Sequence, residues 1–228
     1  MRFSFTMTAF VLAIVFSLTS LVAEEEKTTD KMKSLGAKTL LMPSPVWIIG
    51  SYDKAGRPNV MTASWAGICC SQPPMVTVSL RKATYTYGNI MASKAFTVNI
   101  PSEKFAGMAA YFGTVSGRDV DKFAASGLTP VKSALVNAPY IKEFPLVIEC
   151  KLLRTIEFES LEQNPWMHTM FIGEIVDVKA VESILTNDIP DITKLKPFVS
   201  AQGNSGFYGI GASLGSLKEL KKAVDVKR

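Results

Sequence analysis

Short stretches in which apolar and polar residues alternate limit the fold of this chain more than any other feature. In residues 75–80, Val76, Val78 and Leu80 alternate with Thr77 and Ser79. This period of two is typical of a strand that is buried on one face. Similar runs occupy residues 46–51, 59–64, 95–100, 146–159 and 167–179. Short strands without long helices between them favour a mainly β fold, a closed antiparallel barrel, over a doubly wound sheet.

The helices that the sequence predicts are short and lie between these strands. They occupy residues 85–93, 103–112, 119–126 and 214–224. Ser102 is in position to cap the second, Gly127 ends the third, and the fourth carries an apolar stripe. The segment from Ile184 to about residue 211 has no regular pattern. Because no glycine-rich phosphate fingerprint opens a helix after the first strand, a Rossmann domain is disfavoured.

The first residues have the composition of an export signal. Arg2 precedes the apolar run 9–16, and Ala23 is followed by three glutamates. This pattern predicts a signal peptide over 1–23, a mobile leader over 24–37, and a single domain with a C-terminal helix over 38–228. The expected location is periplasmic. An uncleaved membrane anchor is the alternative, since residues 3–23 are long enough to span a bilayer.

Charge and cysteine usage exclude several classes of function. The formal net charge of +5 includes cations of the C-terminal tail, and no stripe of lysines and aromatics predicts a nucleic-acid surface. One histidine and three cysteines give no metal-ligand spacing. We expect Cys69, Cys70 and Cys150 to pack as small apolar residues, although an exported chain leaves a Cys70–Cys150 disulfide possible.

A cluster of cations and hydroxyls follows the strand at 75–80. Arg81 and Lys82 supply charge, and Thr84 and Thr86 supply neutral donors. Such groups bind a phosphate through charge-assisted hydrogen bonds. The alternative is a solvated turn in which Thr84 only caps the next helix.

Residues 59–71 form a second candidate. Small residues beside Trp65 let the backbone approach a planar ligand while the indole covers one of its faces. The same residues also fit a strand that ends in a turn, with Trp65 in the core. His168, the only histidine, is either a hydrogen-bond donor in a site or a structural residue of its strand.

The sequence resembles the flavin-reductase-like FMN-binding split barrels, and among them the flavoredoxin type. The resemblance extends over residues 38–217 and rests on seven motifs that occur in the family's order. The motifs are NVMTASWAGICCSQPPMVTVSLRK (59–82), YT (85–86), AFTVNIP (95–101), SGRDVDKFAASGLTP (116–130), FPLVIEC (144–150), HTMFIGEIVDV (168–178) and YGIGASLG (208–215).

The resemblance implies a six-stranded antiparallel Greek-key split β-barrel with short peripheral helices, assembled as a homodimer. It also implies bound FMN, whose phosphate is held by Arg81, Thr84 and Thr86, with Lys82 as a further candidate. The ribityl chain and ring would contact Thr62, Ala63, Ser64 and Trp65, with Ala66 and Gly67 allowing close backbone approach. Lys122, Phe123 and His168 match positions near the ring.

The implied function is that of an FMN-dependent oxidoreductase, either a flavin reductase or a flavoredoxin-like electron carrier. The flavin carries the chemistry, so no catalytic nucleophile is expected. NAD(P)H is the usual donor, whereas an exported copy would draw electrons from a redox protein. The rival interpretations are a non-catalytic exported protein that binds flavin or another planar ligand, and an interaction module without cofactor.

Overall fold

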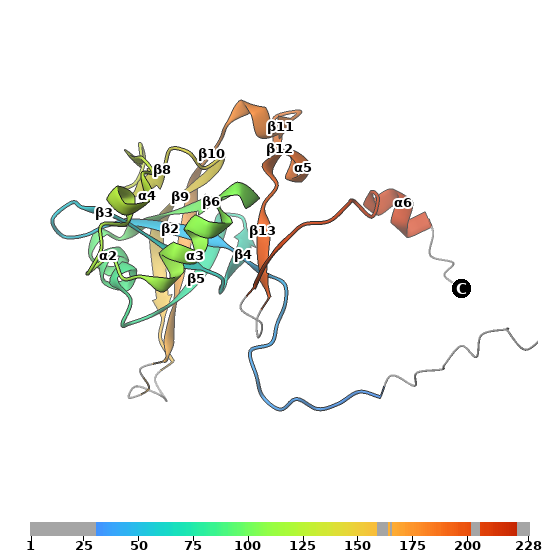
Figure 1. Cartoon of the computed structure of the whole chain (residues 1–228), viewed down its shortest axis with the longest axis horizontal. Coiled ribbons are helices and arrows are strands. Elements are labelled where there is room, and N and C mark those ends of the chain that lie inside the picture. Colours follow the sequence, from blue (N-terminus) through green and yellow to red (C-terminus); the bar gives the residue numbers. More distant parts are fainter. Residues whose placement is uncertain (1–30, 159–163, 165, 202–205, 223–228) are drawn as a thin grey trace, which may run out of the picture. The chain divides into compact units, whose positions relative to one another are not determined.

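The computed structural model describes residues 31–158, 164, 166–201 and 206–222 (Figure 1). The chain divides into two units, Met1–Lys38 and Thr39–Arg228. The described residues of the first unit, 31–38, are exposed and form neither helix nor strand. The predicted signal peptide lies outside the described residues. Within those ranges, no helix is long and apolar enough to cross a membrane.

A seven-stranded antiparallel sheet forms the body of the second unit (Figure 1). Its strands follow one another across the sheet in the order β3-β2-β6-β9-β10-β5-β4. Their bounds are β2 Trp47–Tyr52, β3 Pro58–Ala63, β4 Ala66–Ser71, β5 Pro74–Arg81, β6 Ala95–Ile100, β9 Leu146–Ile156 and β10 His168–Ala180. The smaller sheets contain β1 Ser44–Pro45, β7 Pro130–Lys132, β8 Pro139–Ile141, β11 Leu185–Thr186, β12 Ile189–Pro190, β13 Phe198–Ala201 and β14 Gly206–Gly209.

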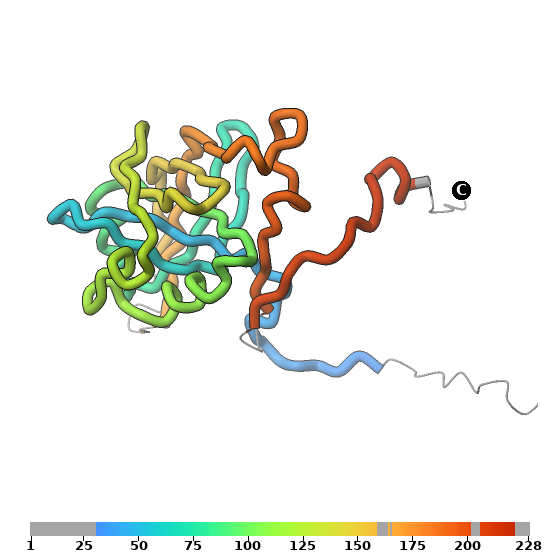
Figure 2. The backbone as a smooth tube through the Cα atoms, turned by 45° about the horizontal axis from the view of Figure 1, so that its top comes forward, coloured from blue at the N-terminus to red at the C-terminus, as the bar shows by residue number. Residues whose placement is uncertain are grey.

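The connection between the two outermost strands shows that this sheet curls into a barrel. β3 and β4 are at opposite ends of the strand order, yet only Ser64 and Trp65 separate them in the chain. Ala63 and Ala66 are three residues apart, so their Cα atoms lie within about 11 Å even in a fully extended chain, and the two edges must come close together there. β3 and β4 are not paired with each other, which leaves the barrel split along this line. Figure 2 traces the path of the backbone.

The main sheet contains one strand more than the six expected. The six predicted strands are all present, but Ala66–Ser71, expected to be part of a turn, forms β4. β4 lies at the edge of the sheet and pairs only with β5, with a bulge between Ile68 and Cys70. Most of its residues are exposed or half-buried, so it lacks the apolar alternation that identifies an internal strand.

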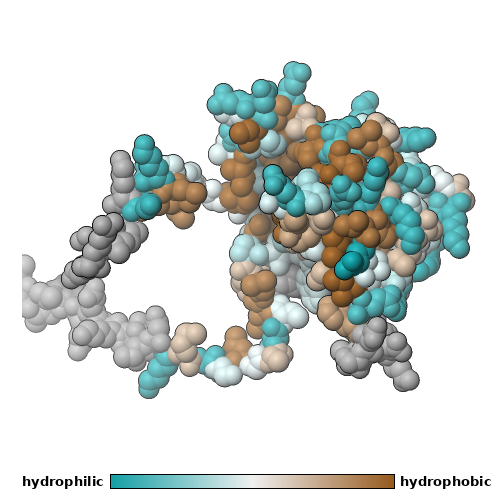
Figure 3. Space-filling model, turned by 180° about the vertical axis from the view of Figure 1, so that it is seen from behind, coloured by the Kyte–Doolittle hydropathy of each residue, from teal (hydrophilic) through white to brown (hydrophobic). Residues whose placement is uncertain are grey.

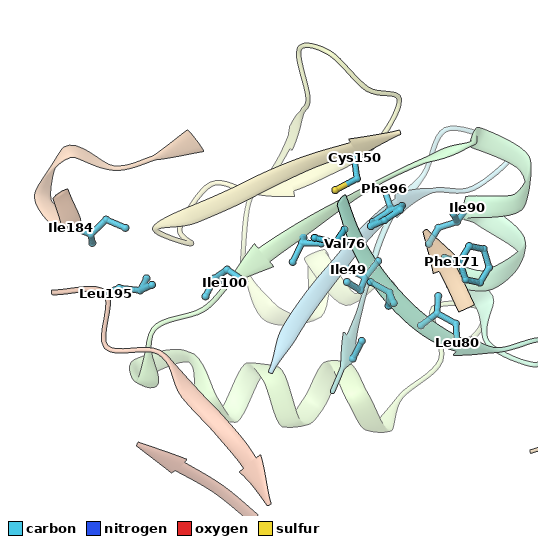
Figure 4. Packing of buried hydrophobic residues seen from close by; sticks show 13 residues of the cluster. Ile49, Val76, Leu80, Ile90, Phe96, Ile100, Cys150, Phe171, Ile184 and Leu195 are labelled. Carbon is cyan, nitrogen blue, oxygen red and sulfur yellow. The ribbon is translucent and has the colours of Figure 1, made fainter. Parts of the chain in front are cut away.

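The core fills the inside of the barrel. Val76, Val78 and Leu80 of β5 point into it, as their alternation predicts, while all six residues of β6 are buried. Figure 4 shows Phe96, Phe171 and Ile90 packed in this cluster. A Cβ at Gly173 would lie 2.4 Å from Cζ of Phe96, so β10 passes the phenyl ring where only a glycine fits.

Short helices pack against the barrel strands β2 and β3. Helix α2 (Tyr85–Ser93) has the predicted bounds and is capped by the Thr84 side chain, which accepts from the Tyr87 N–H. A 3-10 turn, η2 (Glu103–Phe105), precedes α3 (Ala106–Thr114), and Ser102 makes no side-chain cap, so that predicted cap was wrong. Helix α4 (Lys122–Ser126) starts later than predicted because Asp121 caps it, and it ends at Gly127.

The segment after Ile184, expected to be irregular, contains several very short elements. A 3-10 turn, η4 (Glu182–Ile184), leads into β11 and β12, and α5 (Ile192–Leu195) precedes β13 and β14. Elements of two to four residues are too short to show a period. The predicted C-terminal helix is α6 (Leu217–Lys222), and the last two residues of the prediction lie outside the described ranges.

Candidate functional site

A cavity of about 300 Å³ opens where β3, the end of β5 and the start of α2 face the loop after α3. It is lined by Asn59, Met61, Arg81, Ala83, Thr84, Tyr85, Thr86, Phe112, Gly113, Thr114, Val115, Ser116, Gly117, Arg118 and Lys122. Three segments that are distant in the sequence therefore form one site. Four of the predicted site residues meet here, namely Arg81, Thr84, Thr86 and Lys122.

The cavity carries concentrated positive charge. Arg81 is the last residue of β5, Lys122 the first of α4, and Arg118 belongs to the loop between α3 and α4. The Arg118 Nη1 donates to the carbonyl oxygen of Ala83 at 2.7 Å, which holds this guanidinium beside the start of α2. Among the described residues that line the cavity there is no carboxylate. Its electrostatics therefore favour an anion.

Two threonine hydroxyls also line the cavity, and only that of Thr86 has a hydrogen free to donate to a ligand. Thr84 has the capping role that was the structural alternative, and it also lines the cavity. Its hydroxyl donates to the Arg81 carbonyl at 2.9 Å. Thr86 is almost completely buried, and its Oγ1 accepts a hydrogen bond from Nδ2 of Asn59 at 2.9 Å. Arginine, lysine and threonine donors without a carboxylate are what a phosphate monoester requires.

Lys122 is a buried cation. Only 3% of its surface is exposed, and Nζ donates to the carbonyl oxygen of Phe112 at 2.8 Å. Burial penalises the charged form and lowers the pKa of Lys122 to about 8. The ammonium group is therefore close to releasing its proton, and an anion in the cavity would stabilise its charge.

Two other predicted residues lie outside this cavity. The Lys82 Nζ donates to Oε2 of Glu157 at 2.7 Å. Phe123 is 4% exposed and packs in a second apolar cluster with Phe112 and Phe144.

The predicted ring-binding residues are divided between the core and a second hollow. Ser64, Trp65 and Ala66 line an apolar hollow of about 430 Å³, together with residues of the segment 39–45. Thr62 donates to the Ala109 carbonyl of α3 at 2.5 Å, and Ala63 is buried in the core. A Cβ added to Gly67 would meet nothing within 4 Å, so the backbone there is open to close approach.

His168 links a residue that lines this hollow, Trp65, to one that lines the cationic cavity, Arg81. Its ring packs on that of Trp65 with a centroid distance of 4.3 Å, and its partner in the β5–β10 pairing is Arg81. Burial, and the charge of Arg81, lower the pKa of His168 below its ordinary value. Both effects favour the neutral form of the imidazole.

Sequence reasoning missed several residues of the site. Arg118 lies in a quoted motif, but no local pattern linked it to a ligand. Tyr85 donates to Oδ2 of Asp53 at 2.7 Å, and the guanidinium groups of Arg57 and Arg118 lie 5.8 and 5.4 Å from its ring centre. These contacts fix one wall of the cavity, and they join segments that the sequence does not show to be neighbours.

The cysteines are all free thiols, and the expectation that all three pack as apolar residues was wrong in part. Cys150 is buried, and burial raises its pKa to about 12. Cys69 is exposed and Cys70 half-buried, because both lie on the edge strand β4. Among the described residues no cluster of His, Cys, Asp or Glu could hold a metal ion.

The family follows from the match of residues 39–196 to the model of the flavin reductase like domain. The chain belongs to this family, as the resemblance had implied, and its fold is the family's mainly β split barrel.

Several solved structures are similar to this chain in sequence and fold. It is similar to the flavoredoxin of Desulfovibrio vulgaris (Miyazaki F), with 50% identity, a TM-score of 0.76, and coverage of 82% of this chain and 97% of that one. The flavoredoxin from Methanosarcina acetivorans is 29% identical, with a TM-score of 0.75 and coverage of 85% and 98%. Nitrilotriacetate monooxygenase component B from Bacillus cereus, at 22% identity, shares the fold, with a TM-score of 0.75 and coverage of 82% and 100%.

Proposed function

We propose that this protein binds FMN and acts as an FMN-dependent oxidoreductase, either a flavin reductase or a flavoredoxin-like electron carrier. The observation that carries the proposal is the cavity in which Arg81, Arg118 and Lys122 converge with the hydroxyl of Thr86, while Thr84 caps the helix beside them. This donor set suits the phosphate of FMN. The family, and the likeness to two flavoredoxins, support a flavin as the ligand.

In this proposal the two hollows divide the ligand between them. The cationic cavity, at about 300 Å³, is at the lower limit for a small-ligand site and would hold the phosphate end. The isoalloxazine would extend toward Ser64, Trp65 and Ala66, where the second hollow is apolar. Gly67 leaves the backbone of β4 accessible at this edge.

The residues of the chain bind and orient the ligand, and none acts as a nucleophile. When bound, FMN supplies hydride or single-electron transfer. Trp65 would cover part of the ring and exclude water from it. In its neutral form, which burial and the charge of Arg81 favour, His168 would offer one N–H donor and one acceptor to the flavin or its partner.

The electron donor and the location belong to the same proposal. If residues 1–23 direct export or anchor the chain, NAD(P)H is replaced by a redox protein of the periplasm or membrane. A reductant-dependence assay distinguishes the two donors. Anaerobic reduction of the bound flavin by NADH or NADPH at the rate of free flavin or slower would argue for a protein donor, or for a binding protein without turnover.

A homodimer is the assembly that we propose. Apolar side chains gather on the surface of the folded domain (Figure 3). Among the strands of the main sheet, the exposed apolar residues include Ile68 on β4, Leu153 on β9 and Val178 on β10, which are 65%, 57% and 52% exposed. Exposed apolar area of this kind is typical of an interaction surface. Light scattering at several concentrations tests this, and a monomer throughout would contradict it.

Binding is tested by mixing the purified protein with FMN and removing unbound ligand by gel filtration. The proposal predicts that flavin absorbance elutes with the protein at about one FMN per chain. Riboflavin, which lacks the phosphate, is the matched control ligand, and we expect it to be retained much less.

A further inference from the structure

We propose that Asn59 is the positioning residue that makes the cationic cavity selective for a phosphate monoester. The inference rests on the proposed function, since FMN is the monoester in question. Asn59 is only 4% exposed, and its Nδ2 already donates to neighbouring hydroxyls, so it acts through the residues around it.

The first of these residues is Thr86. Nδ2 of Asn59 donates to Oγ1 of Thr86 at 2.9 Å, and also to Oγ of Ser51 at 3.4 Å. A hydroxyl has one hydrogen to donate and two lone pairs. Because Thr86 already accepts from Asn59, its own hydrogen is directed elsewhere, and among the described residues no acceptor for it is present. Thr86 lines the cavity, where a phosphate oxygen would accept this hydrogen.

The second contact is with the loop that carries Arg118. A Cβ on Gly117 would lie 2.0 Å from Oδ1 of Asn59 and 3.0 Å from Cδ1 of Tyr85. The backbone of this loop therefore rests directly on the Asn59 amide. Arg118 is the next residue, so the position of the amide sets the position of the guanidinium.

The third observation is an unsatisfied atom. Oδ1 of Asn59 is buried and has no hydrogen-bond partner in the part of the chain that the structure describes. A buried unpaired acceptor costs stability, so an asparagine is a poor choice at this position for folding alone. An asparagine at this position is explained if its amide orients the two phosphate donors, Thr86 and Arg118.

The test compares three variants of the full chain. Asn59→Ala removes the donor, and Asn59→Asp keeps the shape while replacing the N–H donor by an acceptor. Asn89→Ala is the matched control, because Asn89 is also buried and donates to Ser51 at 3.2 Å but does not line the cavity. Dissociation constants are measured for FMN and riboflavin, and melting temperatures with and without inorganic phosphate.

We expect both Asn59 variants to bind FMN at least about tenfold more weakly, while their affinity for riboflavin changes less than about twofold. The difference corresponds to the loss of one hydrogen bond to the charged phosphate group. Asn89→Ala should leave the FMN-to-riboflavin ratio unchanged even if its melting temperature falls equally. An equal loss for both ligands, or no loss for either, would overturn the inference.

The phosphate experiment separates this inference from the proposed function. If the wild type does not retain FMN but inorganic phosphate raises its melting temperature, the FMN proposal fails. The proposed role of Asn59 is then supported if phosphate no longer raises the melting temperature of the Asn59 variants but still raises that of Asn89→Ala. If phosphate does not stabilise the wild type and FMN does not bind, both proposals are wrong.

Discussion

His168 lies directly opposite Arg81 in the antiparallel pairing of β10 with β5. The pairing joins the cationic cavity, which Arg81 lines, to the ring of Trp65, which packs on His168. A phosphate group and a planar ring could therefore be recognised at neighbouring places on the same barrel edge. The positive charge of Arg81 also helps to keep the imidazole neutral.

Replacing Arg81 should abolish most of the FMN affinity. We expect Arg81→Ala to weaken FMN binding by about 10- to 100-fold, since a hydrogen bond to a charged group contributes about 1.5–3 kcal/mol. Lys82→Ala is the neighbouring control, because Lys82 is paired with Glu157 and does not line the cavity. Fluorescence titration with FMN measures both. Equal losses for the two variants would show that the loss is not specific to the cavity.

The buried Lys122 should make FMN binding dependent on pH. Its pKa of about 8 lies below the ordinary value of 10.5, so Lys122 loses its proton in the folded protein at a lower pH than an exposed lysine does. FMN affinity should therefore fall between pH 7 and 9, by up to about tenfold per unit above the pKa. Lys122→Met, which keeps the volume, should bind FMN more weakly at pH 7 with a flat profile over this range.

The charge on Lys122 should favour FMN binding but lower the stability of the folded protein. Below pH 8 the folded state holds a charge that burial disfavours, and this cost is relieved as the pH rises from 8 toward 10.5. Lys122→Met should therefore be more stable than the wild type at pH 7 in urea unfolding without ligand. A less stable variant would contradict this, and would mean that the hydrogen bond from Lys122 to the Phe112 carbonyl outweighs the cost of burying the charge.

His168 should titrate below its ordinary range. As the only histidine in the chain, it gives a single imidazole signal in NMR spectra of tag-free protein. Its pKa is lowered, so its contribution to stability is present above about pH 6.5 and is lost as the pH falls through the folded-state value. Arg81→Gln should raise the midpoint, since the charge is removed. A wild-type midpoint at or above 6.5 would contradict this placement of the ring.

Two glycines should respond differently to alanine. Gly173→Ala places a Cβ 2.4 Å from Phe96, and overpacking of this kind costs about 1–3 kcal/mol in urea unfolding. Gly67→Ala meets nothing within 4 Å and should change stability by less than about 0.5 kcal/mol.

Gly67→Ala also tests the ring-binding edge. If the backbone of β4 approaches the flavin there, this variant should lose FMN affinity with its stability intact. Unchanged affinity would remove Gly67 from the site.

The strands could be predicted because their signal is local. The alternation of Val76, Val78 and Leu80 identified β5, and Thr84 at the cap of α2 gave that helix its correct bounds. β4 was missed because an edge strand with a bulge shows no such period. The very short elements after Ile184 contain too few residues to have one.

The site could be predicted only in part, for a different reason. Arg81, Thr84 and Thr86 are close in sequence, so their donors were apparent as a cluster. Arg118 and Asn59 reach the same cavity only because the barrel brings β3 and the loop after α3 against the start of α2. Arg118 is in no local pattern that marks a ligand, and Asn59, although it begins the second candidate stretch, was given no role there. Lys82, which belongs to the cationic cluster, is paired with Glu157 instead.

The most direct test of the account is a visible absorption spectrum of the purified protein after mixing with FMN and desalting. The account predicts flavin bands that remain with the wild type at about one FMN per chain and are largely lost from Arg81→Ala. A folded wild-type protein that stays colourless would contradict the assignment of the cationic cavity as a flavin phosphate site.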